Sequence, residues 1–303
     1  MPVTLPQLSR REFLKRAVLA GAGMVTASSH ANLFGKARDQ HTFAFFSDCH
    51  VAADAALKNS GVNMADNLAA SVNELAAWPV KPAAVFVNGD LAFKSGLPAD
   101  YATFSKLIEL VRALAPIHLN LGNHDQRENF WSAFPLDAVK QKCVPQKQCA
   151  VLETDLANWF LLDSLAVTNA SSGELGAVQV AWLDSELATR KEKPAVIVGH
   201  HNLQSPGANS ALNDSAALVE IFSKHPQVKA FVFGHTHNWH VETHATGVHL
   251  VNLPPTGYVF KAGRPSGWVR CTLARDGVEF ELRSLDANHP EHAQVKKLSW
   301  RVG

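Results

Sequence analysis

The sequence has few cysteines, no excess of charge of one sign and no long apolar run. Four cysteines in 303 residues are too few for a fold held together by disulfides. Lys and Arg number 28 against 27 Asp and Glu, so the formal charge is +1 and no nucleic-acid polymer is expected as a partner. No stretch reaches the ~20 apolar residues that span a bilayer, so no stable membrane anchor is expected.

Histidine, in contrast, is abundant. The chain has 15 histidines, and the neutral imidazole is the commonest metal ligand among side chains. The apolar share of 47% is ordinary for a globular protein. A chain of this length fits one large domain that buries roughly 75% of its unfolded surface without disulfides.

The N-terminus is typical of a twin-arginine export signal. The run Ser-Arg-Arg-Glu-Phe-Leu-Lys at 9–15 precedes a short apolar stretch at 17–25, and Ser-His-Ala at 29–31 offers a cleavage site. We therefore expect residues 1–31 to be a signal peptide and the protein to leave the cytoplasm folded, through the twin-arginine export machinery, for the periplasm or the exterior. The alternative is an amphipathic N-terminal helix with a chance arginine pair.

Export would place the cysteines in an oxidising compartment. Cys143 and Cys149 flank five residues and either close a small loop or remain two separate thiols. Cys49 and Cys271 have no evident partner in the sequence.

Short apolar segments alternate with segments of helical spacing, a pattern typical of an α/β domain. The expected strands are 42–46, 83–87, 117–121, 159–162, 195–198, 230–233 and 248–253, with a hairpin formed by 268–273 and 278–282. The expected helices are 67–77, 101–114, 177–191 and 211–224. The loop at 202–213 is long and rich in Gly, Pro, Ser and Asn, and long loops are often functional.

Polar clusters follow five of the expected strands directly. They are Asp48 and His50; Asp90; Asn123, His124 and Asp125; His200 and His201; and His235 and His237. Because the loops beyond the carboxyl ends of strands form the ligand crevice of an α/β sheet, these clusters are expected to converge on one point.

Spacing within the clusters indicates a metal site. Asp48 and His50 are two residues apart, as are His235 and His237, so in an extended segment each pair would point the same way and Cys49 would point away. Carboxylate, amide and imidazole ligands together suit Mn, Fe, Zn or Co.

Taken together and in this order, the clusters resemble the calcineurin-like metallophosphoesterases over about 42–286. Gly-Asn-His-Asp-Gln-Arg at 122–127, followed by Phe130 and Phe134, is similar to the branch of class III cyclic nucleotide phosphodiesterases and glycerophosphodiesterases. The resemblance implies a single domain at 40–286, a four-layer α/β/β/α sandwich, followed by a C-terminal tail at 287–303.

The resemblance also implies a ligand set for two divalent metal ions. Asp48, His50 and His237 would hold the first ion; Asn123, His200 and His235 would hold the second; and Asp90 would bridge both. Asn202 stands where the family has proline in its His-x-Pro motif, so His201 remains an alternative to His200.

By the same resemblance, a metal-bound hydroxide would attack a small phosphate-ester substrate. His124, oriented by Asp125, would stabilise the phosphoryl oxygens or protonate the leaving alkoxide, unless it is structural. Arg127 would bind substrate phosphate or form an ion pair, and Trp239 would line the substrate pocket or pack in the core.

The function expected is that of an exported, dinuclear phosphodiesterase. The alternatives are a phosphomonoesterase of the same fold and a metal-binding scaffold without turnover. The complete ligand set speaks against the scaffold, and the motif ends carry no evident Arg or Lys cluster for a dianionic monoester, which favours diesters.

Overall fold

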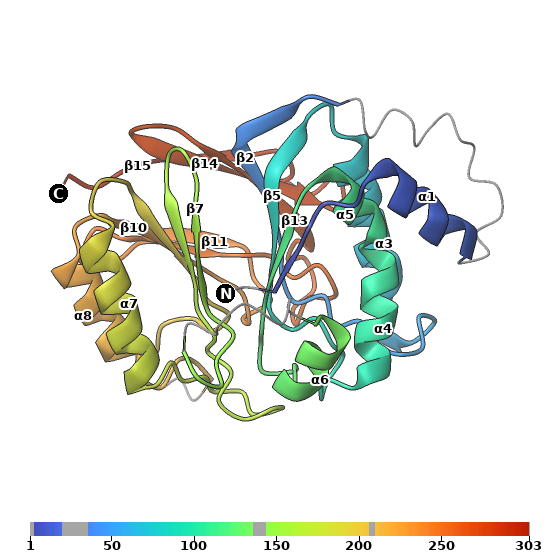
Figure 1. Ribbon diagram of the computed structural model, residues 1–303, viewed down its shortest axis with the longest axis horizontal. Coiled ribbons are helices and arrows are strands. Elements are labelled where there is room, and N and C mark those ends of the chain that lie inside the picture. The colour runs from blue at the N-terminus through green and yellow to red at the C-terminus, as the bar shows by residue number, and fades with distance from the viewer. Residues whose placement is uncertain (1–2, 20–35, 136–143, 206–209, 303) are drawn as a thin grey trace.

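The computed structural model describes residues 3–19, 36–135, 144–205 and 210–302. Its two large β-sheets face each other (Figure 1). In spatial order, the seven-stranded sheet consists of β1 (Val3–Leu5), β6 (Ile117–Asn120), β5 (Lys81–Asn88), β2 (Arg38–Phe46), β13 (Gly267–Leu273), β14 (Gly277–Ser284) and β15 (Val295–Ser299). The six-stranded sheet consists of β11 (His240–Thr243), β12 (His249–Asn252), β10 (Val228–Phe233), β9 (Ala195–Val198), β8 (Asn158–Leu161) and β7 (Ala150–Glu153). A two-stranded ribbon pairs β3 (Lys58–Asn59) with β4 (Val62–Asn63).

Helices cover the outer face of each sheet (Figure 1). Beside the seven-stranded sheet lie α1 (Arg10–Leu19), α3 (Met64–Ala77), α4 (Pro98–Leu107), α5 (Glu109–Leu114) and α6 (Arg127–Ala133). Beside the six-stranded sheet lie α7 (Ala177–Thr189) and α8 (Ser215–Lys224). The four-layer α/β/β/α sandwich is thus confirmed.

The alternation of side chains along β2 shows how the layers form. Phe43 and Phe45 point into the core between the sheets, where their rings lie 4.7 and 5.9 Å from the Trp159 ring. Ala44 and Phe46 point the other way, into the core beneath the helices. Because successive side chains of a strand alternate between its two faces, a strand that is apolar throughout must be covered on both sides.

Each strand expected from the sequence is present, with ends that shift by a few residues at most. The expected helix at 101–114 is two helices, α4 and α5, which meet at Ile108. Strands β1, β7, β11 and β15 were not expected, because they are short or mostly exposed and so lack a continuous apolar pattern.

The segment expected as a leader contacts the domain. Strand β1 pairs antiparallel with β6. Leu8 and Phe13 are buried in a small cluster with Ala113, whereas Arg10 and Arg11 are exposed. The expected cleavage site at 29–31 and Cys143 lie outside the described residues.

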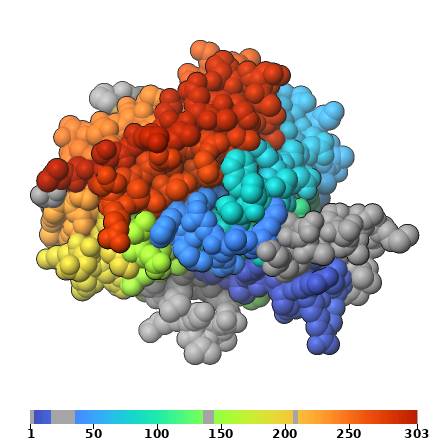
Figure 2. Space-filling model, turned by 90° about the horizontal axis from the view of Figure 1, so that it is seen from above, coloured from blue at the N-terminus to red at the C-terminus, as the bar shows by residue number. Residues whose placement is uncertain are grey.

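The segment expected as a C-terminal tail extends the sheet. Strand β15 pairs antiparallel with β14, and the Arg301 guanidinium donates hydrogen bonds to the backbone carbonyls of Val228 and Thr246. Figure 2 shows the C-terminal strands, coloured orange to red, as a continuous surface beside the blue residues of the N-terminal half. Among the described residues, no helix combines the length and apolar character needed to cross a bilayer.

Candidate metal centre

The polar clusters meet because the strands that carry them are parallel within each sheet. Strands β2, β5 and β6 run parallel, and so do β9 and β10. Backbone hydrogen bonds join the loops beyond them: the Asp48 N–H donates to the Gly89 carbonyl at 3.1 Å, and the His50 N–H donates to the Asp90 carbonyl at 2.9 Å. The His235 N–H donates to the Asp48 carboxylate at 3.1 Å, which links the two sheets.

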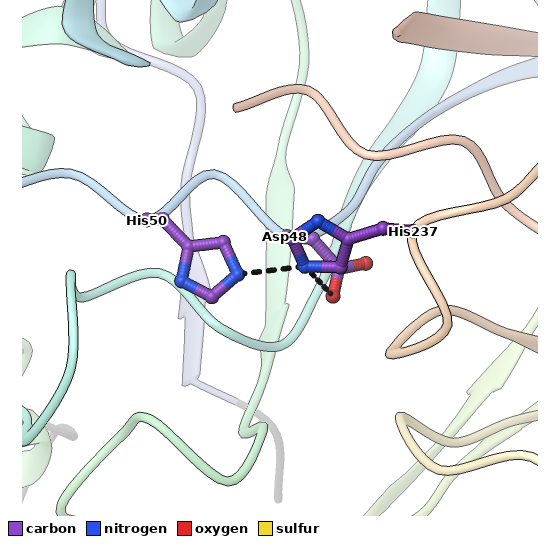
Figure 3. Close-up of side chains that lie close together, drawn as sticks. All are labelled: Asp48, His50 and His237. Atoms are coloured by element: carbon purple, nitrogen blue, oxygen red, sulfur yellow. Dashed lines mark hydrogen bonds and ion pairs between the residues drawn. The ribbon is translucent and has the colours of Figure 1, made fainter. Parts of the chain in front are cut away.

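The first cluster consists of Asp48, His50 and His237 (Figure 3). The two Nε2 atoms of His50 and His237 are 3.0 Å apart. His237 Nε2 lies 3.5 Å from Asp48 Oδ1. All three residues are buried, with their ligand atoms within 4.8 Å of one another.

The hydrogen bonds of the two imidazoles fix their tautomers. His50 Nδ1 lies 3.1 Å from the Phe93 carbonyl, and His237 Nδ1 lies 2.5 Å from the Tyr258 carbonyl. Since a carbonyl can only accept, each Nδ1 carries the hydrogen and each Nε2 carries a lone pair. Burial lowers the pKa of His50 to about 4 and that of His237 to about 2, so both rings are neutral near pH 7. Two lone pairs that face each other at 3.0 Å repel, and a cation between them removes that repulsion.

The second cluster consists of Asp90, His200 and His235. His200 Nδ1 lies 2.9 Å from the Asn88 carbonyl, which turns Nε2 toward Asp90 at 3.3 Å. Asn123 is also buried, and the N–H of the next residue, His124, donates to Asp90 Oδ1 at 2.8 Å. Within the described part of the chain, the Asn123 oxygen and His200 Nε2 have no hydrogen-bond partner. Buried polar atoms almost always have one, so these two atoms fit metal ligands.

Asp90 lies between the clusters. Its Oδ2 atom is 3.6 Å from His50 Nε2 and 3.3 Å from His200 Nε2. Burial acts to raise the pKa of Asp90, but the neighbouring His200 outweighs it and holds that pKa well below its usual range. Burial, together with the Asp90 charge, raises the pKa of Asp48 to about 7. Asp90 is therefore ionised near pH 7, and a bound cation would also favour the ionised form of Asp48.

The ligand residues adopt an unusual backbone conformation. Positive φ angles of 48–67° occur at Asp48, His50, Asp90, His235 and His237. Asp48 and His50 share the first cluster, as expected, whereas His235 and His237 belong to different clusters. The expected extended backbone is wrong, because each of these four residues has a left-handed backbone conformation and the resulting turns orient the side chains. Such a conformation costs on the order of 1–3 kcal/mol per residue and is typical of functional sites. The expected orientation of Cys49 is confirmed, because its side chain lies in the apolar core.

Two glycines leave room for the ligands. A Cβ at Gly122 would lie 2.2 Å from Asp90 Oδ1, and one at Gly89 would lie 2.4 Å from His200 Nδ1. Gly89 also has a φ of +80°, which favours glycine. These positions therefore have to be glycine for the carboxylate and the imidazole to sit where they do.

The geometry favours His200 over His201 as the ligand. His201 Nδ1 lies 2.7 Å from Ser164 Oγ, and His201 belongs to none of the candidate ligand clusters among the described residues. Its ring packs 4.6 Å from that of His235, so it supports a ligand. His200 itself belongs to the cluster with Asp90 and His235.

His124 lies at the edge of the centre, with its ring 5.1 Å from the His50 ring. The Lys94 carbonyl accepts from His124 Nδ1 at 2.7 Å and orients the ring. Asp125 was expected to do this, but its carboxylate accepts instead from the Leu91, Ala92 and Gly122 N–H groups and from the Tyr101 hydroxyl. Burial raises the pKa of Asp125 to about 6. Asp125 thus links the loop after β5 to the loop after β6 by hydrogen bonds.

Two expected substrate contacts are corrected. Arg127 forms a two-pronged ion pair with the fully buried Asp163, with both N–O distances 2.8 Å. Trp239 is 3% exposed and packs in the core between the sheets. Arg127 therefore forms an ion pair and Trp239 packs in the core, which were the alternatives to substrate contact.

Two aromatic residues that contact the centre could not be identified from the sequence. The Tyr258 ring lies 5.0 Å from the His50 ring and 4.7 Å from the His237 ring. The Phe260 ring stacks on His237 at 3.9 Å. Neither residue is a usual metal ligand, and both follow the last expected ligand by about 20 residues, so spacing could not connect them to it.

Comparisons with known proteins agree with this arrangement. The calcineurin-like phosphoesterase family profile matches residues 41–239. A 3′,5′-cyclic-nucleotide phosphodiesterase from Nostoc sp. is 26% identical over 226 residues, which are 73% of this chain and 80% of the relative. A glycerophosphodiester phosphodiesterase from Enterobacter lignolyticus is 26% identical over 177 residues, 55% of this chain and 60% of the relative.

A solved structure shares the fold. The dimetal phosphatase from Danio rerio superposes with a TM-score of 0.65 at 15% identity, over 86% of this chain and 99% of the other. The family profile spans well over half of the chain and covers every candidate ligand. The chain therefore belongs to the calcineurin-like phosphoesterase family.

Proposed function

We propose that this protein hydrolyses small phosphodiesters at a centre of two divalent metal ions. The observation that carries the proposal is the position of Asp90, whose Oδ2 atom lies within 3.6 Å of ligand nitrogens from both clusters. A carboxylate oxygen placed between two ligand sets is suited to serve both ions of a metal pair.

The ligands divide into two sets around Asp90. Asp48, His50 and His237 would hold one ion, and Asn123, His200 and His235 the other. The donor types suit Mn, Fe, Zn or Co. When bound, two divalent ions lower the pKa of water and neutralise charge on the phosphoryl group.

His124 would contact the substrate. Because its Nδ1 is held by the Lys94 carbonyl, its Nε2 is the atom left to meet the substrate. Because the Nδ1 hydrogen is donated to that carbonyl, Nε2 carries a hydrogen only when the ring is protonated. The imidazolium would then donate a hydrogen bond to a phosphoryl oxygen or a proton to the leaving alkoxide. The backbone N–H of His124 donates to Asp90 Oδ1 at 2.8 Å, which fixes the residue relative to the bridging carboxylate.

The diester preference is supported by relatives named as cyclic-nucleotide and glycerophosphodiester phosphodiesterases. A phosphomonoesterase is the second candidate, since Lys261 and Arg264 line a pocket beside His237 and could attract a dianion. Metal-loaded protein should hydrolyse bis(p-nitrophenyl) phosphate with a higher kcat/KM than p-nitrophenyl phosphate. A reversed preference would favour the monoesterase. Hydrolysis of neither substrate would favour a metal-binding scaffold without turnover.

The role of Asn123 can be tested by metal content. Asn123→Ala removes the buried amide oxygen that has no other partner among the described residues. We expect elemental analysis of manganese-loaded protein to fall from two ions per chain toward one. An unchanged content of two ions would exclude Asn123 as a ligand.

We further propose export through the twin-arginine machinery to the periplasm or the exterior. The exposure of Arg10 and Arg11 supports it, because a receptor can reach both side chains. In a bacterial host, the Arg10→Lys/Arg11→Lys variant should stay in the cytoplasm, while an Arg16→Lys control is exported like the parent. Equal export of all three proteins would exclude this route.

A further inference from the structure

Phe260 exposes a large aromatic surface beside the metal ligands. Its side chain is 67% exposed although many smaller apolar residues are buried. One face of its ring stacks on His237 at 3.9 Å, with an angle of 12° between the planes. The ring is therefore held in place at one face, while much of the rest of its surface is open to solvent.

Phe260 lines an open pocket of about 350 Å³ together with His237, Asn252, Lys261 and Arg264. Asn252 is 7% exposed, and its Nδ2 donates to the Thr236 hydroxyl. Its Oδ1 is buried and has no partner within the described residues. The pocket thus combines a flat aromatic ring, a hydrogen-bond acceptor without a donor, and two cations.

We infer that Phe260 is a specificity-determining residue that stacks on the base of a nucleotide phosphoester bound at the metal centre. The inference rests on the proposed function and names its substrate class. Aromatic rings stack on any base, because every base has a π-face. Asn252 Oδ1 would accept an N–H or O–H from the nucleoside, and Lys261 and Arg264 would attract the anionic substrate. An ester of glycerol has no ring and would gain little from Phe260.

Two ligands that differ only by the base provide the test. Isothermal titration calorimetry of manganese-loaded protein with 5′-AMP and with ribose 5-phosphate measures what the base contributes. We expect 5′-AMP to bind at least about tenfold more tightly, a difference of about 1.4 kcal/mol. Phe260→Ala should make the two affinities similar without weakening the binding of ribose 5-phosphate. Phe260→Trp should restore the difference in affinity.

A matched control separates stacking from a general loss of apolar surface. Val178 on α7 is 66% exposed, and Val178→Ala should leave both affinities unchanged. Equal affinities in the parent protein, binding of neither ligand, or a difference that survives Phe260→Ala would overturn the inference. Because calorimetry needs no turnover, failure to hydrolyse any ester would count against the proposed function alone.

Discussion

The left-handed backbone conformation of the candidate ligands, and the glycines around them, hold the ligand side chains in place. Asp48, His50, Asp90, His235 and His237 all have positive φ. Gly122 allows the Asp90 carboxylate to approach the backbone of the next loop. None of this can be read from residue types alone, because aspartate and histidine are ordinarily right-handed or extended. The identities of these ligand candidates could be predicted from the sequence, whereas the turns that aim them could not.

The first prediction concerns Gly122. In Gly122→Ala the new Cβ would lie 2.2 Å from Asp90 Oδ1 and displace the shared carboxylate. A shift of this kind should reduce turnover of bis(p-nitrophenyl) phosphate on the order of 100-fold and lower metal content. Gly199→Ala is the matched control: its Cβ would meet the Phe231 ring at 3.3 Å and Leu162 Cβ at 3.9 Å, so a much smaller loss is expected. Equal losses in the two variants would contradict the account.

The second prediction concerns His124. His124→Ala should keep the metal content of the parent protein and lower kcat by about 100-fold or more, because the loss is of proton transfer or of a phosphoryl contact. Elemental analysis and steady-state kinetics on the same sample measure both effects. Loss of metal in this variant would make His124 a ligand, and unchanged kcat would make it structural.

At the scale of elements, helices and loops are fixed by contacts between residues that are far apart in sequence. Arg127, the first residue of α6, pairs with Asp163 in the segment after β8. Asp163 lies 36 residues further on and belongs to no motif, so sequence spacing could not reveal the pair. Trp239 was likewise ambiguous, since an aromatic residue after a ligand can line a pocket or fill the core, and only the packing of the sheets decides.

The third prediction follows from that ion pair. Arg127→Ala leaves the Asp163 carboxylate buried without its cation, which should lower the free energy of unfolding by about 3–5 kcal/mol. The double variant Arg127→Met/Asp163→Asn removes both charges and should recover much of the loss. Urea unfolding measures the stability, and KM for bis(p-nitrophenyl) phosphate should stay unchanged in folded protein. A raised KM together with parental stability would instead indicate that Arg127 binds the substrate.

The fourth prediction concerns β1 and α1. A chain that starts at residue 36 lacks the antiparallel partner of β6 and the buried Leu8 and Phe13. We expect a free energy of unfolding lower by roughly 3 kcal/mol, from the apolar surface that these two side chains bury, with unchanged kcat because the centre lies on other loops. If export removes residues 1–31, the exported form also lacks β1 and α1, and the same loss of stability is expected for it.

The double variant Leu8→Ala/Phe13→Ala in the full chain is the matched comparison. It should reproduce most of the loss, because it removes the same apolar contacts while keeping the chain length. Parental stability in both proteins would show that β1 and α1 contribute little to the domain.

At the scale of the whole molecule, the sandwich brings five strand ends from two sheets to one place. The alternation of apolar strands and helices predicted that the polar clusters meet, because parallel strands end at the same edge of a sheet. The division of the strands between two sheets was implied only by the resemblance to the metallophosphoesterases. The short strands β1, β7, β11 and β15 and the aromatic pair Tyr258 and Phe260 were not predictable. Their positions depend on tertiary contacts that leave no periodic pattern in the sequence.

The central claim is that Asp90 bridges two metal ions. The most direct measurement is anomalous diffraction from crystals of manganese-loaded protein, for the parent chain and for Asp90→Ala. The account predicts two anomalous peaks about 3.5–4 Å apart on either side of the Asp90 carboxylate, with at least one lost in the variant. A single peak, or two peaks that lie away from Asp90 and persist without it, would contradict it.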